Sequence, residues 1–399
     1  MSETLRRATF WVLVAVVLLS AWQGSRVSSL GTPARVLGLL AAVLALSTVA
    51  LHGRRHRIVE LHAVVLLLVG WALLSVLWSS DPASTLMYAA TLGQLALLLL
   101  LAWEFGDRPG DVRRLMTAFV AGCALSAVGV LASGSGTTGE EARLTANGFN
   151  ENDLGSTLAL GVPFAWYLAA RSRTPLGTAI FSGYLVLGSL GVLLTGSRGA
   201  LVVLLVALAL VPLGWRQTSG WGRVLVATCL VGGALAAIAV VPAETFDRLR
   251  STTTAVSDTD LSGRVPLWQA SLDVIEEHPL LGVGGGATPV AIEQAISERE
   301  SSHDTFLSVA AGLGFVGVTL FTVVLLLAAH RVARLPARER GFASAALAAL
   351  LVALLPLHWE LQKPLWIVLA LLVGLSREHA APLPASAVRL PTSPVRSLP

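Results

Sequence analysis

Three short polar stretches interrupt an apolar sequence, and each holds a residue that can act on a phosphate or a hydroxyl group. The first, Thr195-Gly196-Ser197-Arg198-Gly199-Ala200, separates two apolar runs. A guanidinium group beside the first N–H groups of a helix makes a good anion site, and the glycines allow close approach to that backbone. An interfacial arginine that extends to lipid head groups would give the same pattern. The residues alone leave both interpretations of Arg198 open.

The second stretch begins at Ser262-Gly263-Arg264 and predicts a helix on the membrane surface. Pro266 suits the first turn of a helix, and Pro279 requires the helix to end by residue 278. One stripe at helical spacing contains Arg264, Trp268, Leu272 and Ile275. This is typical of an amphipathic helix at the membrane surface, with the tryptophan at the interface. On periodicity alone, lipid anchoring is the simpler explanation of Arg264.

The third stretch, Ser301-Ser302-His303-Asp304-Thr305-Phe306, leads into another apolar run and places His303 at the membrane edge. A neutral imidazole there can take the proton of an incoming hydroxyl group, and Asp304 is a possible proton partner. Most single histidines are structural, and His278 and His358 compete with His303 on the residues alone.

Two further stretches predict local structure rather than chemistry. Residues 143–155 contain Asn147, Asn150 and Asn152, which predict turns and a helix cap, although asparagines could also contact sugar hydroxyls. Residues 282–286 are rich in glycine, but they lack the ending and the flanking strand of a nucleotide phosphate loop. They predict a sharp turn, followed by a short helix from about residue 288 to 298.

The elements that must position these residues are membrane helices. The chain is 54% hydrophobic and only 13% charged, against about 25% charged in soluble domains. About 20 apolar residues cross a bilayer core. Candidate spans lie near residues 8–24, 36–52, 61–79, 86–103, 114–133, 154–171, 176–195, 200–215, 223–241, 304–330, 341–358 and 363–377. We therefore predict an all-α polytopic bundle of about 12 spans, whose first segment is an uncleaved helix.

The distribution of basic residues predicts the orientation of the bundle. With the N-terminus inside, about 19 of the 28 basic residues fall in inner segments and about 9 in outer ones. Both termini are then cytoplasmic, residues 134–153 and 242–303 lie outside, and residues 378–399 form a disordered tail. The same bias explains the net charge of +4 without a nucleic-acid partner.

Several classes of site are disfavoured by what the sequence lacks. Cys123 and Cys229 lie in apolar segments, which excludes a disulfide framework or a zinc knuckle and predicts inert packing residues. No paired carboxylates or histidine cluster has metal-ligand spacing. Few ionisable residues lie deep in the spans, whereas a coupled ion transporter usually needs some. No strong internal repeat of the kind that many transporters show is visible. The sequence does not predict an oligomeric state.

Four motifs, taken in order, resemble the O-antigen ligase family of bacterial envelope glycosyltransferases, which includes polymerase-like members. They are Asn147-Gly148-Phe149-Asn150-Glu151-Asn152, Thr195-Gly196-Ser197-Arg198-Gly199-Ala200, Gly263-Arg264 with Trp268 and His278-Pro279-Leu280-Leu281-Gly282-Val283-Gly284, and Ser302-His303-Asp304 with Leu307 and Gly312-Leu313-Gly314. The resemblance covers about residues 5–377 and implies one ligase-like transmembrane domain over residues 1–377.

The resemblance implies glycan transfer from an undecaprenyl-diphosphate carrier to a lipid or cell-wall acceptor hydroxyl at the outer face of the cytoplasmic membrane. The expected reaction is inverting and needs no metal, cofactor or nucleotide sugar. His303 would orient or deprotonate the acceptor, while Arg198 and Arg264 would bind the diphosphate. Secondary substrate contacts are expected from Arg248, Arg143 and Asn152.

Two positions depart from the family pattern. Asp304 stands where an asparagine usually follows the histidine, so a carboxylate there could raise the pKa of the imidazole. Glu151 stands where a proline usually separates the two asparagines. A polysaccharide polymerase, a flippase for lipid-linked glycans and a non-catalytic membrane scaffold remain alternatives, and the sequence does not separate a ligase from a polymerase.

Overall fold

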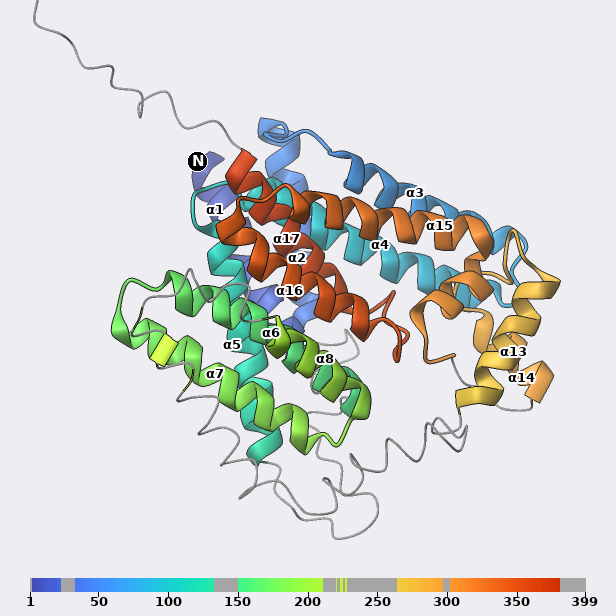
Figure 1. The fold of residues 1–399 in the computed structure, drawn as a ribbon. Helices are drawn as coiled ribbons and strands as arrows, with labels where there is room; N and C mark the ends of the chain where they lie inside the picture. Colours follow the sequence, from blue (N-terminus) through green and yellow to red (C-terminus); the bar gives the residue numbers. More distant parts are fainter. Residues whose placement is uncertain are drawn as a thin grey trace, which may run out of the picture.

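The computed structural model describes residues 2–22, 33–132, 150–210, 220, 223–224, 227, 264–296 and 302–380. Across these ranges every regular element is a helix, which confirms the all-α prediction (Figure 1). The bundle helices are α1 (Ser2–Ser20), α2 (Pro33–His52), α3 (Glu60–Leu74) with the short η1 (Ser75–Leu77), α4 (Pro82–Phe105), α5 (Asp111–Ala132), α6 (Glu151–Arg171), α7 (Pro175–Leu194), α8 (Arg198–Ala209), α15 (Thr305–Ala333), α16 (Ala337–Ala353) and α17 (Lys363–Ala380). Two shorter helices, α13 (Arg264–Glu277) and α14 (Thr288–Ile296), lie beside the start of α15.

Six helices in the described part of the chain are long and apolar enough to cross a membrane: α2, α3 with η1, α4, α5, α7 and α15. Each coincides with a predicted span to within a few residues. Helices α1, α6, α16 and α17 also fall on predicted spans, whereas α8 has only 12 residues. The predicted span near 223–241 lies almost wholly outside the described residues. The described part of the chain is thus helical where spans were predicted, and the number of about 12 spans stays a prediction.

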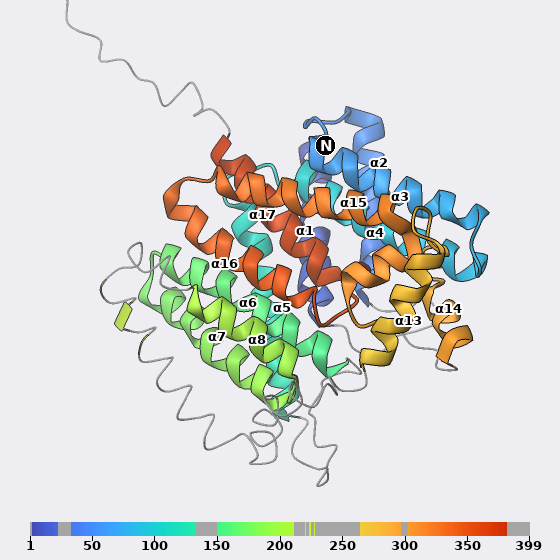
Figure 2. The ribbon, with the colours of Figure 1, turned by 45° about the vertical axis from the view of Figure 1, so that its right-hand side comes forward.

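Helix α6 is the most enclosed element of the bundle. It contacts α5, α7, α8 and α16, and the whole run from Leu154 to Ala169 is buried (Figure 2). Its glycines permit this close packing, because a Cβ atom at Gly161 would lie 2.4 Å from the hydroxyl of Tyr184. That hydroxyl donates a hydrogen bond of 2.8 Å to the Leu158 carbonyl. Helix α2 is the opposite case, since Val43 and Leu46 on its outer face are 61% and 73% exposed.

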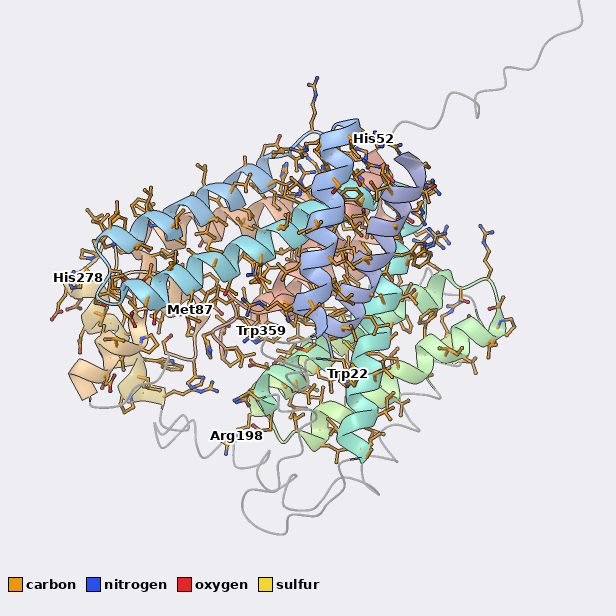
Figure 3. All side chains as sticks on the ribbon, turned by 180° about the vertical axis from the view of Figure 1, so that it is seen from behind. Trp22, His52, Met87, Arg198, His278 and Trp359 are labelled. Atoms are coloured by element: carbon orange, nitrogen blue, oxygen red, sulfur yellow. The ribbon has the colours of Figure 1, made fainter. Side chains whose placement is uncertain are left out.

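Charged side chains gather at the end of the bundle where α1 begins and α4 ends, here called the ion-pair end. Arg6 lies 3.1 Å from the Glu104 carboxylate, and Arg7 lies 3.0 Å from Asp111. Arg171 at the end of α6 pairs with Glu339 near the start of α16. The basic residues predicted to face the cytoplasm therefore cluster at one end. Figure 3 shows His52 at this end and Arg198 on the far side of the bundle.

One prediction about the C-terminal half is corrected, and another stays a prediction. Residues 378–380, predicted to begin a disordered tail, continue α17, and the Glu378 carboxylate accepts a hydrogen bond of 3.1 Å from the Gly110 N–H. On α13, Leu272 of the predicted stripe is 48% exposed, as it would be on a helix whose apolar stripe faces a membrane, so the stripe stays a prediction. The buried face of α13 consists of Leu267, Ala270, Ser271 and Val274. This face packs against the glycine-rich turn, α14 and α15 rather than against a flat membrane surface.

Candidate functional site

His303 is held by its neighbours at the start of α15. Its φ is 49°, and it is the one non-glycine residue with positive φ in the described part of the chain. On one side, the carbonyl of buried Ser302 accepts a hydrogen bond of 2.9 Å from the indole N–H of Trp268. On the other side, Asp304 caps α15, because its Oδ1 accepts the Leu307 N–H at 2.9 Å. The backbone on both sides thus fixes where the half-buried imidazole lies.

Asp304 has a structural task in addition to the proton-partner role that its position suggested. Burial raises the pKa of this carboxyl, and the hydrogen bonds from the N–H groups of Leu307 and Phe306 lower it by a smaller amount. An aspartate N-cap that satisfies helix N–H groups is a common stabilising arrangement. Whether Asp304 also shifts the pKa of His303 stays a prediction.

A second histidine packs against the first. The rings of His303 and His358 lie 5.6 Å apart, edge to face at 72°. His358 belongs to the segment between α16 and α17, which Thr305 ties to α15. The Thr305 hydroxyl donates to the Leu357 carbonyl at 2.6 Å and accepts the Trp359 N–H at 2.9 Å. Of the two competing histidines, His358 lies beside His303, whereas His278 lies at the exposed end of α13 (Figure 3).

The same segment reaches the start of α6. The indole of Trp359 donates to the Asp153 carboxylate at 2.7 Å. Asp153 in turn interacts electrostatically with both His303 and His358. Asn150 is the N-cap of α6, accepting the Asn152 N–H at 2.9 Å, which confirms the predicted asparagine cap. The start of α6 and the histidine pair therefore belong to one cluster.

Arg198 is the first residue of α8 and adjoins this cluster through Ser197. The Ser197 hydroxyl donates to the Asn152 side-chain oxygen at 2.8 Å and accepts the Ala200 N–H at 3.2 Å. The turn between α7 and α8 is as short as predicted, with Gly196 at φ 61°. Gly199 lies against the segment after α16, since an added Cβ atom there would be 3.0 Å from Pro356. The helix N-terminus predicted beside Arg198 is present.

Arg264 is the first residue of α13, one helical turn before Trp268. Residues four positions apart share a helix face, so Arg264 lies on the face whose tryptophan holds the backbone beside His303. The guanidinium is half-buried, and burial lowers its pKa. A bound anion would stabilise the charged form of this half-buried guanidinium group. The predicted helix limits are confirmed, with α13 ending at Glu277 just before His278-Pro279.

The glycine-rich turn of residues 282–286 fixes α13 and α14 to α15. The N–H of Val283 donates to the Ala311 carbonyl at 3.0 Å, and that of Gly284 donates to Gly312 at 2.9 Å. Helix α15 is broken at this level, with Gly314 at φ 66° and ψ −169°. The turn thus uses its backbone to pair with a neighbouring helix, which agrees with the predicted sharp turn rather than a phosphate loop.

Glu360 is a buried acid that the sequence reasoning missed. Its Oε1 accepts the Ser308 hydroxyl at 2.6 Å, the residue is 5% exposed, and burial raises its pKa. In the described part of the chain Oε2 has no hydrogen-bond partner. An acid between apolar segments was itself a signal, because ionisable residues near a membrane core usually have a function.

Three predicted substrate contacts have different outcomes. Arg143 and Arg248 lie outside the described residues, as does the first part of the 242–303 loop, residues 242–263. Asn152 is described, and its side-chain oxygen already accepts the Ser197 hydroxyl. Its expected contact with substrate stays a prediction. The segments that carry Arg198, Arg264 and His303 are joined by hydrogen bonds through Trp268, Thr305, Trp359 and Ser197.

Comparison with known proteins bears on this region of the chain. Residues 183–322 match the family model described as O-Antigen ligase, a range that contains Arg198, Arg264 and His303 but not the asparagine stretch. The exopolysaccharide production protein ExoQ of Rhizobium meliloti (strain 1021) is 26% identical over 286 residues. This similarity covers 65% of the chain and 62% of ExoQ, so the chain matches less than two thirds of that relative's length. Both findings support the sequence motifs, and the resemblance to an O-antigen ligase/polymerase-like family is confirmed.

Proposed function

We propose that this protein is a membrane glycosyltransferase that moves a glycan from an undecaprenyl-diphosphate carrier to an acceptor hydroxyl. The observation that carries the proposal is the hydrogen-bonded connection of three segments far apart in sequence. Trp268 links the helix of Arg264 to the residue before His303, and Trp359 with Ser197 continues the connection to Arg198. The family match over residues 183–322 supports the same assignment.

In this mechanism His303 accepts the proton of the acceptor hydroxyl. The acceptor oxygen forms a bond to the anomeric carbon of the glycan while the bond from that carbon to the diphosphate breaks. The electron pair of the broken bond stays with the carrier diphosphate, and attack from the opposite side inverts the anomeric configuration. Arg198 and Arg264 bind the diphosphate and stabilise its growing charge. Arg248 assists them, and Arg143 and Asn152 contact the glycan.

The proposal includes an orientation in the membrane. The ion-pair end faces the cytoplasm together with both termini, and the end that carries Arg198 and His303 faces outward. This assignment rests on the bias of basic residues, many of which pair at the ion-pair end. Residues 1–377 then act as one ligase-like transmembrane domain with the loop of about 242–303 on its outer face.

The direct test is transfer by purified protein with a lipid-diphosphate glycan and a hydroxyl acceptor. A general base contributes about 10²–10⁴ to a rate, so His303→Ala should lose activity by about that factor. Arg198→Ala and Arg264→Ala should also lose most activity, and Arg198→Lys should recover only part because lysine lacks the bidentate fork. Arg173→Ala, an exposed arginine at the far end, is the matched control. Unimpaired transfer by all three alanine variants would contradict the mechanism.

The same assay tests the metal-free chemistry. We expect a chelator to leave transfer unchanged, because the two guanidinium groups supply the positive charge that a metal ion would otherwise provide. Loss of activity with a chelator and rescue by a divalent ion would refute this part of the proposal.

A polysaccharide polymerase of the same family is the second candidate, and the name of ExoQ favours it because it refers to exopolysaccharide production. The donor chemistry is the same, and the acceptor becomes another lipid-linked glycan. A ladder of repeat units in the product would identify a polymerase. A flippase is the candidate from another class, and glycan movement across a bilayer without any transfer would identify it.

A further inference from the structure

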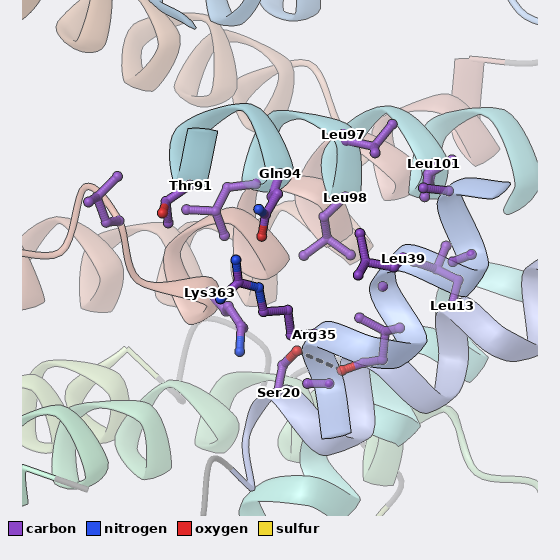
Figure 4. A pocket seen from close by; sticks show the side chains of 17 residues that line it. Leu13, Ser20, Arg35, Leu39, Thr91, Gln94, Leu97, Leu98, Leu101 and Lys363 are labelled. Carbon is purple, nitrogen blue, oxygen red and sulfur yellow. Dashed lines mark hydrogen bonds between the residues drawn. The ribbon is translucent and has the colours of Figure 1, made fainter. Parts of the chain in front are cut away.

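A cavity of about 540 Å³ lies between α1, α2 and α4, and its lining also includes Leu361 and Lys363 (Figure 4). Its wall is mostly apolar and includes Leu39 of α2 with Leu95 and Leu98 of α4. A volume of this size is typical of sites that hold a small molecule. None of the residues proposed above for glycan transfer lines it.

The polar groups of the cavity are two cations and an amide. Figure 4 shows Arg35 of α2 and Lys363 of α17 side by side, with Gln94 of α4 nearby. The two cations are close enough to repel each other. Within the described ranges, no hydrogen bond or ion pair is formed by these three side chains. The hydroxyl of Ser20, which also lines the cavity, donates to the Val16 carbonyl at 2.6 Å.

Two adjacent cations at the edge of an apolar cavity need an anion. A charged side chain close to hydrocarbon is costly unless it is paired, and repulsion between two cations adds to that cost. A phosphate group between Arg35 and Lys363 would remove the repulsion and give both side chains a partner. The Gln94 amide can donate to the same group.

The apolar part of the cavity indicates what carries the phosphate. Leu39 lines the cavity and is 55% exposed among the described residues, so the cavity is open beside α2 in this part of the chain. Along α4 its lining runs from Thr91 to Leu101, roughly 15 Å at 1.5 Å per residue. That is about half of a 30 Å hydrocarbon core, the depth of one leaflet.

We propose that this cavity binds one anionic phospholipid of the bilayer. The phosphate sits between Arg35 and Lys363, and one acyl chain lies against Leu39, Leu95 and Leu98. The lipid joins α2 to α4 at a place where side chains alone leave a gap. The depth of one leaflet suits an acyl chain, whereas a long polyprenyl chain would extend well beyond the cavity. The assignment does not depend on the proposed glycan transfer, because it uses other residues.

The test uses the purified full-length protein in detergent with added phosphatidylglycerol, and lipid retention is measured by native mass spectrometry. We expect phosphatidylglycerol to be retained about tenfold or more over zwitterionic phosphatidylcholine. The double variant Arg35→Gln/Lys363→Gln should lose this preference, and Arg35→Lys/Lys363→Arg should keep it because both charges remain. Equal retention of the two lipids by the natural protein, or an unchanged preference in the glutamine variant, would overturn the proposal.

A second pair of variants tests the apolar part while both cations remain. Gly38 lines the cavity, and a Cβ atom added there meets no atom within 4 Å, so Gly38→Leu fills the space without a backbone clash. Gly70 in the middle of α3 is equally open but lies outside the cavity, so Gly70→Leu is the matched control. We expect weaker phosphatidylglycerol binding in Gly38→Leu only. Displacement of the lipid by an equal amount of undecaprenyl phosphate, or by inorganic phosphate alone, would overturn the assignment to a bilayer phospholipid.

Discussion

Trp268 connects two features of the candidate site at the scale of single residues. It lies on α13 one turn after Arg264, and its indole holds the carbonyl of Ser302 immediately before His303. A non-glycine residue with positive φ, such as His303, costs of order 1–3 kcal/mol and persists only where its surroundings fix it. The indole on one side and the Asp304 cap on the other provide that fixation. Trp268 is therefore a positioning residue for the imidazole.

The first prediction follows from this contact. Trp268→Phe keeps an aromatic ring but leaves the Ser302 carbonyl without its donor, which costs about 1–3 kcal/mol when the carbonyl is buried. We expect the turnover rate to fall while donor affinity changes little, because the base moves and the anion site stays. Transfer rates as a function of donor concentration measure both quantities.

Trp78→Phe is a matched control for that variant. The indole of Trp78 also donates to a backbone carbonyl, that of Leu281 at 3.2 Å, which adjoins the glycine-rich turn rather than His303 in the sequence. Similar losses of turnover in both variants would show that the effect is general destabilisation rather than positioning of the histidine.

The buried acid Glu360 leads to a prediction about pH. Burial raises the pKa of Glu360 in the folded protein, with a smaller like-charge contribution from Asp304, while the Ser308 hydroxyl and His358 act in the opposite direction. The protonated form is therefore favoured by folding. The protonated Glu360 side chain contributes its full stabilisation at pH values below the ordinary carboxyl pKa of about 4.3. This stabilisation is lost as the pH rises through the raised pKa of Glu360 in the folded protein.

Glu360→Gln keeps the shape of the protonated acid and cannot ionise. We expect the melting temperature of this variant to exceed that of the natural protein by an amount that grows between about pH 5 and pH 8. Glu277→Gln, which removes an exposed acid at the end of α13, controls for the loss of one carboxylate. A difference between Glu360→Gln and the natural protein that does not vary with pH would contradict the prediction.

At the scale of elements, the break in α15 decides how α13 and α14 are attached. Gly314 has φ 66° and ψ −169°, a region that essentially only glycine adopts. A Cβ atom there would lie 2.2 Å from the Leu280 carbonyl oxygen. The break frees backbone groups of α15, and the Phe315 N–H donates to the Pro279 carbonyl at 2.8 Å. Two glycine segments thus form the joint between the α13–α14 unit and the bundle.

Gly314→Ala should therefore weaken this joint. We expect a loss of at least about 1–3 kcal/mol from backbone strain, seen as a lower melting temperature and faster proteolysis of the α13–α14 unit. Gly70→Ala is the control, because that helical glycine meets no neighbouring atom and alanine should stabilise α3 by about 0.5–1 kcal/mol. Equal melting temperatures for Gly314→Ala and the natural protein would show that the joint tolerates the side chain.

At the scale of the whole molecule, charge and candidate chemistry occupy different ends of the bundle. Glu104 at the ion-pair end accepts a hydrogen bond from Arg6 at 3.1 Å and from the N–H groups of Arg55 and His56. It therefore joins α1, α4 and the connection between α2 and α3. At the other end, the segment after α16 joins α6, α8 and α15, and it leads into α17, whose first residue Lys363 lines the proposed lipid cavity.

The ion-pair end supplies a prediction about stability. Removing one partner of a buried ion pair leaves the other charge unpaired and typically costs about 3–5 kcal/mol. Arg6 and Glu104 are both nearly inaccessible, and Arg6 keeps a contact of 3.4 Å with Asp107, so Glu104→Gln should cost less than this full amount. It should still lower the melting temperature without changing the affinity for the donor. Glu60→Gln breaks the exposed pair with Arg331 and should cost only about 0.2–1 kcal/mol. Similar effects of the two substitutions would contradict this difference.

The sequence by itself determined the helical class, the positions of most spans and the local structure around the candidate residues. These follow from short-range rules: apolar runs of sufficient length, Pro266 near a helix start, an asparagine cap at the start of α6, and glycines at sharp turns. The family resemblance also depends only on motifs and their order. Such features require no knowledge of which helices are neighbours.

Only the tertiary structure decided which of these segments meet. It placed His358 rather than His278 beside His303, turned a different face of α13 inward, and brought Arg35 and Lys363 to one cavity. The physical reason is that helical periodicity describes a face but not its partner, while packing across the bundle joins residues more than a hundred positions apart. The candidate residues were therefore visible in the sequence, and their common surroundings became visible only in the fold.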